Sequence, residues 1–164
     1  MNWKTILQPV EPEARAALPV QVEQTIELAC SAEVLFDVFE DPASWPVWLG
    51  ITVDWHDEPP FAAGCSRTIR SGPLRALERF TVYERNARMA FFFEKSTSGF
   101  FEAFAEDWIV TSTGPDTCTL TWRVGIQPRG VWSILGFGFR IAMNRLGRQG
   151  FPKLQEYVRR VPLS

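Results

Sequence analysis

The sequence contains few of the residues on which metal centres and nucleophilic enzymes depend. Its 164 residues include one histidine, His56, in the acidic stretch WHDEPP. A metal site or a Ser-His-Asp triad needs further ligands or partners beside such a histidine. We therefore expect His56 to be an exposed loop residue, and we expect no metal and no cofactor.

Paired cysteines and long apolar runs are also missing. Cys30, Cys65 and Cys118 are odd in number and include no CxxC pair, so we expect free thiols in a reducing compartment and no disulfide framework. The first residues lack the apolar run of a signal peptide. The most apolar helical stretch, residues 131–143, is too short to cross a bilayer. These features predict a soluble, cytoplasmic protein without stable membrane insertion.

The chain has almost no net charge, but its acidic and basic residues are concentrated in separate segments. The formal net charge is −2, and without a basic excess or a recognisable motif we expect no nucleic-acid partner. Residues 11–58 hold eleven acidic residues and one basic residue, whereas residues 129–160 hold seven basic residues and one acidic residue. Either the two segments attract each other or are solvated, or the second forms a basic surface for anionic ligands or lipid headgroups.

Aromatic side chains, in contrast, are abundant, with seven Trp and thirteen Phe. Such rings anchor cores and binding sites alike. The length favours one domain, which we place at residues 20–164 after an extended lead-in over residues 1–19.

The first half of the domain predicts a strand followed by two short helices. Residues 20–28 alternate between apolar and polar side chains, as in a half-buried strand. Ser31 is a suitable N-cap for a helix through Phe39. A second short helix or turn follows, carrying Trp45 and Trp48; these two rings are expected to plug the end of the sheet or to cover the mouth of a cavity.

The second half predicts about six antiparallel strands and a long helix. Gly, Pro and Asn residues divide residues 51–127 into short apolar runs, which indicates hairpins. The fold class is therefore α+β. A helix is expected over residues 131–160, with Gly150 and Pro152 bending or interrupting it.

The register of the strands places three charged residues on the inner face of the sheet. In the last strand Leu120 and Trp122 share the apolar face, and a one-residue slip would bury threonines instead. The same test on the earlier strands turns Arg67, Glu78 and Glu106 inward. Unpaired charges there would cost several kcal/mol. Either a bulge or a strand end carries them to solvent, or they form the polar floor of a hydrated cavity.

The predicted terminal helix is apolar almost all round at its start. One stripe, expected to pack on the sheet, consists of Val131, Leu135, Phe139, Ala142 and Leu146. A second flank consists of Ile134, Phe137 and Ile141. Burial under the sheet and loops is the simpler explanation for this flank; contact with a ligand, a partner or a membrane is the alternative.

Three stretches of the sequence resemble one known superfamily. They are IELACSAEVLFDVFEDPASWPVW, GCSRTIRSG and EDWIVTSTGPDTCTLTWRV, and together with the terminal helix they resemble the SRPBCC, or START-like, superfamily in its polyketide cyclase/dehydratase-like branch. The resemblance spans roughly residues 20–160. It implies a helix-grip fold: a curved seven-stranded antiparallel sheet, two short helices, and a long C-terminal helix over a cavity.

The resemblance also bears on function. Relatives hold lipids, sterols, polyketides or plant hormones; some are cyclases or dehydratases, others carry ligands, and one branch is a co-chaperone module. No catalytic motif is shared across the superfamily, so none is carried over to this chain. The Rieske iron–sulfur ligands of related oxygenases are absent, since the chain has one histidine and no paired Cys–His motif.

We expect this chain to bind a small hydrophobic or amphipathic molecule, lipid-like or polyketide-like, as a carrier or sensor. The residues expected to contact it are Arg67, Glu78, Phe80, Phe91, Phe104, Glu106, Trp108, Leu120, Trp122, Leu135, Phe139 and Ala142. One alternative is a cyclase or dehydratase in which Glu106 or Glu78 is the general acid or base and Arg67 stabilises an enolate. Another is a protein-interaction module. Formation of a homodimer is a further possibility.

Overall fold

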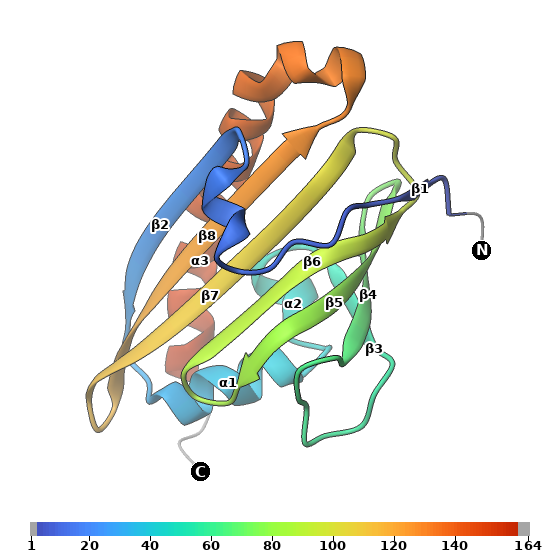
Figure 1. The fold of residues 1–164 in the computed structure, drawn as a ribbon. Helices are drawn as coiled ribbons and strands as arrows, with labels where there is room; N and C mark the ends of the chain where they lie inside the picture. Colours follow the sequence, from blue (N-terminus) through green and yellow to red (C-terminus); the bar gives the residue numbers. More distant parts are fainter. Residues whose placement is uncertain (1–2, 161–164) are drawn as a thin grey trace.

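The computed structural model describes residues 3–160, which form an open antiparallel sheet with a long helix against one face (Figure 1). The first two residues of the expected lead-in and the last four of the expected domain lie outside this range. The strand order is β2-β8-β7-β6-β5-β4-β3, and β1 pairs with β6. The strands are β1 (Thr5–Ile6), β2 (Val20–Leu28), β3 (Thr52–Trp55), β4 (Ser66–Ser71), β5 (Leu74–Glu84), β6 (Arg88–Ser96), β7 (Phe101–Gly114) and β8 (Thr117–Pro128). The helices are the 3-10 helices η1 (Ala14–Ala17) and η2 (Gly130–Leu135), and α1 (Ala32–Glu40), α2 (Trp45–Trp48) and α3 (Gly136–Arg160).

The lead-in crosses the face of the sheet opposite α3 (Figure 1). Leu7 donates its backbone N–H to the carbonyl of Glu94 on β6, and Gln8 donates to that of Glu102 on β7. The lead-in thus pairs with both strands where β6 and β7 part, and its β1 makes an eighth strand where seven were expected. A small second core of Val10, Phe92, Ala103 and Ala105 lies beneath it, which explains why three consecutive phenylalanines, 91–93, are all buried.

Local sequence signals account for the elements that close one end of the sheet. The Ser31 hydroxyl accepts the backbone N–H of Val34 at 3.2 Å and so caps α1 as predicted. On β8 the alternating set from Cys118 to Ile126 is buried, as its pattern predicts. Six strands, β3 to β8, follow the two short helices, in the order that the sequence predicts.

Of the two outcomes expected at Gly150 and Pro152, a bend or an interruption, the C-terminal helix does not show the interruption. It continues without interruption from Gly136 to Arg160, through Pro152. Phe151 and Leu154 on either side of this proline are buried against the sheet and short helices, and this packing offsets the hydrogen bond that proline removes. Gly147 lies against Gln24 of β2, where a Cβ would come within 2.4 Å of the amide oxygen. The glycine therefore permits close approach of helix and sheet.

The start of the helical segment also differs from the prediction. Residues 130–135 form a 3-10 helix, which breaks the 3.6-residue period of the expected stripe. Val131 and Leu135, expected against the sheet, are exposed, and so are Ile134, Phe137 and Ile141. Burial of this flank under the sheet and loops is thus the wrong explanation.

Candidate functional site: a cavity between the sheet and α3

A cavity of about 250 Å³ lies between the inner face of the sheet and α3. Its lining residues come from α2 and the segment after it, from β4 to β8 and from α3. They are Trp45, Leu49, Ile51, Arg67, Ile69, Ser71, Leu74, Glu78, Phe91, Phe93, Phe101, Phe104, Glu106, Trp108, Trp122, Ala142, Met143, Leu146, Gly147 and Phe151. Most of these are aromatic or aliphatic, and three carry charge. The small exposed residues Ser71 and Ala142 lie where the cavity approaches the surface.

Arg67 and Glu78 form a buried ion pair in the wall of this cavity. They are opposite each other on β4 and β5, and Arg67 Nε lies 2.5 Å from Glu78 Oε2. The two side chains are 1% and 2% exposed. A register shift follows Leu77, so the expected bulge exists, but it keeps Glu78 inward, and the solvent-exposed alternative is wrong. Burial raises the pKa of Glu78, and the charge of Arg67 opposes the rise.

Aromatic rings enclose the guanidinium of Arg67. Its central carbon lies 4.5 Å from the ring centre of Trp45 and 5.0 to 5.2 Å from those of Trp55, Phe80 and Phe91. Cation–π attraction stabilises the charge in these surroundings. Nη1 of this guanidinium is buried and has no hydrogen-bond partner among residues 3–160. A buried donor is costly to leave unpaired, and the two N–H bonds of Nη1 are left without an acceptor among these residues.

Glu106 is held by two tryptophans. Its Oε2 accepts the indole N–H of Trp108 at 2.8 Å and that of Trp122 at 2.7 Å. Trp108 and Trp122 are directly paired on β7 and β8, which brings both donors to one oxygen. Burial raises the pKa of Glu106 to about 7; the negative charge of Glu78 adds to the rise and the two indole bonds oppose it. The side chain is half-buried, because it faces the cavity that it lines.

Eight of the twelve residues expected to contact a ligand line this cavity. They are Arg67, Glu78, Phe91, Phe104, Glu106, Trp108, Trp122 and Ala142. The structure does not bring the other four to its wall. Phe80 lies behind Arg67, and Leu120 is buried in the core below. Leu135 belongs to η2 and is exposed, while Phe139 packs on Phe101 at a ring separation of 5.3 Å.

The sequence interpretation missed several lining residues, among them Phe93, Phe101 and Phe151. Phe93 alternates with Phe91 on β6, and both rings line the cavity. Phe101 begins β7, before any period is established, and Phe151 follows Gly150, where an interruption was expected. Trp45 and Trp48 are each 1% exposed and pack together at 4.8 Å, so they form the plug at the end of the sheet, with Trp45 also facing the cavity.

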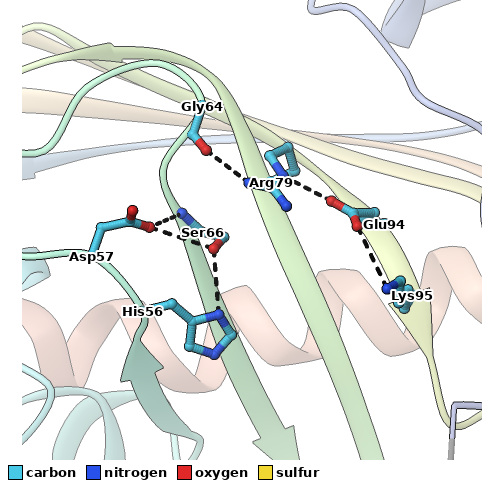
Figure 2. Close-up of polar contacts among 7 residues, drawn as sticks. All are labelled: His56, Asp57, Gly64, Ser66, Arg79, Glu94 and Lys95. Atoms are coloured by element: carbon cyan, nitrogen blue, oxygen red, sulfur yellow. Dashed lines mark hydrogen bonds and ion pairs between the residues drawn. The ribbon is translucent and has the colours of Figure 1, made fainter.

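His56 lies outside the cavity and is exposed, as expected. Its ring nitrogens contact the hydroxyls of Ser66, at 3.3 Å, and Thr68, at 3.0 Å. Figure 2 shows that Asp57 bonds to Ser66 and not to the histidine. In a catalytic triad a carboxylate orients the imidazole, and Asp57 does not do so here. The hydrogen bonds of His56 and Asp57 instead link the end of β3 to Ser66 and Thr68 of β4. Among residues 3–160 no group of His, Cys, Asp and Glu is placed to hold a metal ion.

Residues 19–159 match the family described as polyketide cyclase/dehydrase and lipid transport. The chain belongs to this family. Proteins similar to this chain include uncharacterised proteins of Mycobacterium tuberculosis and Mycobacterium bovis, each 34% identical over 143 residues, which cover 85% of both chains.

Solved structures show the same fold at low sequence identity. A START superfamily protein from Mycobacterium smegmatis has a TM-score of 0.70 at 14% identity, over 87% of this chain and 99% of the other. The Zhui aromatase/cyclase from Streptomyces sp. R1128 has a TM-score of 0.61 at 12% identity, over 84% of this chain and 90% of the other. The START-like fold expected from the sequence is thereby confirmed. No helix of the described chain has the length and hydropathy needed to cross a membrane.

Proposed function

We propose that this protein binds a small amphipathic molecule, with an apolar or aromatic body and at least one oxygen acceptor, in the cavity beneath α3. One observation carries the proposal: an aromatic-walled cavity contains a buried guanidinium whose Nη1 has no partner among the described residues. Ligand sites combine apolar walls with a few fixed polar groups in this way. A carbonyl, phenol or carboxyl oxygen of the ligand would accept from Arg67.

The dimensions of the cavity limit the ligand. Ligand pockets usually measure roughly 300–1,000 Å³, and an apolar cavity of about 150 Å³ admits benzene. The 250 Å³ of this cavity suits a molecule of about two rings or a short acyl chain. Glu106 adds selectivity, because it is a hydrogen-bond donor when protonated and repels anions when ionised.

Native mass spectrometry of the purified protein tests this proposal. The protein should carry a small molecule at one copy per chain, and the Ala142→Trp variant, which fills the cavity from the accessible surface of α3, should carry none. Retention of the same molecule by Ala142→Trp would place the ligand outside the cavity. A bare chain in both forms would likewise count against a ligand carrier.

A second candidate function, enolisation of a carbonyl substrate, is favoured by the pKa of Glu106. A carboxyl with a pKa of about 7 is suited to general acid–base catalysis at neutral pH. Glu106 would remove a proton from the carbon beside a carbonyl, and Arg67 would hold the enolate oxygen. With 1-tetralone in D₂O, wild type should then speed deuterium exchange at the α-carbon, whereas Glu106→Gln should bind the ketone without doing so. Binding without exchange in both proteins leaves the carrier function alone.

A further inference from the structure

Large apolar side chains are exposed together at one end of the molecule. Of the eight exposed large hydrophobic residues among residues 3–160, five lie between positions 131 and 141, and Ile134 and Phe137 are 82% and 75% exposed. We call Val131, Ile134, Leu135, Phe137 and Ile141 the apolar tip. Figure 1 shows η2 and the start of α3 projecting beyond the end of the sheet, at the end opposite α1. Clustered exposure of this kind marks contact with a protein or a membrane.

The residues that flank the apolar tip in the sequence are basic: residues 129–145 contain Arg129, Arg140 and Arg145 and no acidic residue. Residues 117–155 contain six basic residues and no acidic residue. Arg129, Arg140 and Arg145 form no ion pair among the described residues. Arg140 lines, together with Phe137, a groove between the start of β2 and α3. The tip therefore presents apolar side chains beside guanidinium groups that form no ion pair within residues 3–160.

This combination matches a lipid surface. Helical segments that lie in a membrane interface bury an apolar flank at the acyl boundary and place Lys or Arg among the headgroups. A second copy of the chain fits less well, because two tips facing each other would bring the same arginines together. We propose that the apolar tip docks the protein reversibly on a membrane that contains anionic phospholipids. The apolar side chains enter the headgroup–acyl boundary and the arginines contact phosphates.

The tip and the cavity share one helix. Ala142 and Met143, one turn to two turns after Phe137, line the cavity, and Phe139 packs on the lining residue Phe101. With a rise of about 1.5 Å per residue, docking would hold the wall of the cavity roughly 8 Å from the embedded side chains. Docking would therefore bring the proposed ligand site close to the lipid phase. The docking itself does not depend on a bound ligand.

Co-sedimentation with vesicles tests the docking proposal. The wild-type protein should bind to vesicles of 3:1 phosphatidylcholine and phosphatidylglycerol at 0.1 M NaCl. It should bind far less to vesicles of pure phosphatidylcholine. The double variant Ile134→Ser/Phe137→Ser should lower the partition coefficient about tenfold or more. The matched control is Val47→Ser, an exposed apolar residue on α2; the neighbouring Leu49 meets α3 at Gly150, about 20 Å along the helix from the tip. The control should bind as wild type does.

Three results would overturn the proposal. They are absence of binding to the anionic vesicles, binding that the double variant leaves unchanged, and equal binding to neutral vesicles. Sedimentation velocity on the same proteins tests for a second copy of the chain at the tip. If the wild type does not bind vesicles but forms a dimer, and the double variant is a monomer, the tip is a dimer interface. Circular dichroism of both variants verifies the fold, which substitution of exposed side chains should preserve.

Discussion

Glu106 lies among the aromatic side chains of the cavity wall, where two indole N–H groups donate to its carboxyl. The raised pKa has a consequence for stability. Between the ordinary pKa of 4.5 and the folded value of about 7, the folded chain keeps a proton that the unfolded chain has released. The contribution of this residue to stability is therefore present at low pH and is lost as the pH rises through 7.

Glu106→Gln should remove this pH dependence. The amide keeps an oxygen that can accept the two indole bonds but carries no charge. At pH 5 the variant and the wild type should have similar free energies of unfolding, and by pH 8 the variant should be more stable by on the order of 2–3 kcal/mol. Urea unfolding at several pH values measures the difference. A constant difference between pH 5 and 8 would show that Glu106 ionises normally.

The inward orientation of the three charged residues could be predicted from the sequence, whereas the position of some of their neighbours could not. Arg67, Glu78 and Glu106 each fall in line with apolar residues of their strand, so period-2 alternation placed them inward. Alternation gives the face of the sheet but not the depth of a side chain. For this reason it also selected Leu120 and Phe80, which lie in the packed core and behind Arg67. Depth depends on how α3 and α2 cover the sheet, and the pattern within a strand does not encode that.

Among the elements, the strands from β2 onward and α1 could be predicted from alternation and capping. The structure at the two ends of the chain could not. The helical stripe failed at residues 131–135, where the segment is a 3-10 helix projecting from the sheet. The lead-in has little periodicity, and its pairing with β6 and β7 depends on backbone groups left open where these strands part. Long-range backbone pairing of this kind has no signature in the side chains of residues 4–8.

A close contact between elements gives a prediction at this scale. Gly125 of β8 lies under η1, and a Cβ there would come within 2.6 Å of the Arg15 carbonyl oxygen. Because that neighbour is backbone, Gly125→Ala should displace the lead-in and lower the free energy of unfolding by about 1–3 kcal/mol. Gly138→Ala is the matched control, since a Cβ there meets nothing within 4 Å and alanine favours the helix by about 0.5–1 kcal/mol. Chemical denaturation compares them; equal stability of the two variants would refute the packing of the lead-in.

In the whole molecule, the sheet, the plug of Trp45 and Trp48, and α3 enclose a cavity, and the lead-in crosses the opposite face of the sheet above a small second core. The fold could be foreseen because strand patterning and the resemblance indicate the same architecture. The ligand could not, because its identity depends on the shape and polarity of a cavity that twenty residues from most of the elements line together.

Titration with 2-naphthol, a neutral two-ring probe of suitable size, tests the ligand-binding claim most directly. The ¹H–¹⁵N signals of the indole groups of Trp108 and Trp122 report on the cavity, because both groups bond to Glu106. We predict that these two signals shift and saturate as the probe is added, and that Ala142→Trp abolishes the shifts. If the two indole signals of the folded wild-type protein stay unchanged at millimolar 2-naphthol, the cavity does not admit such a ligand and the account is contradicted.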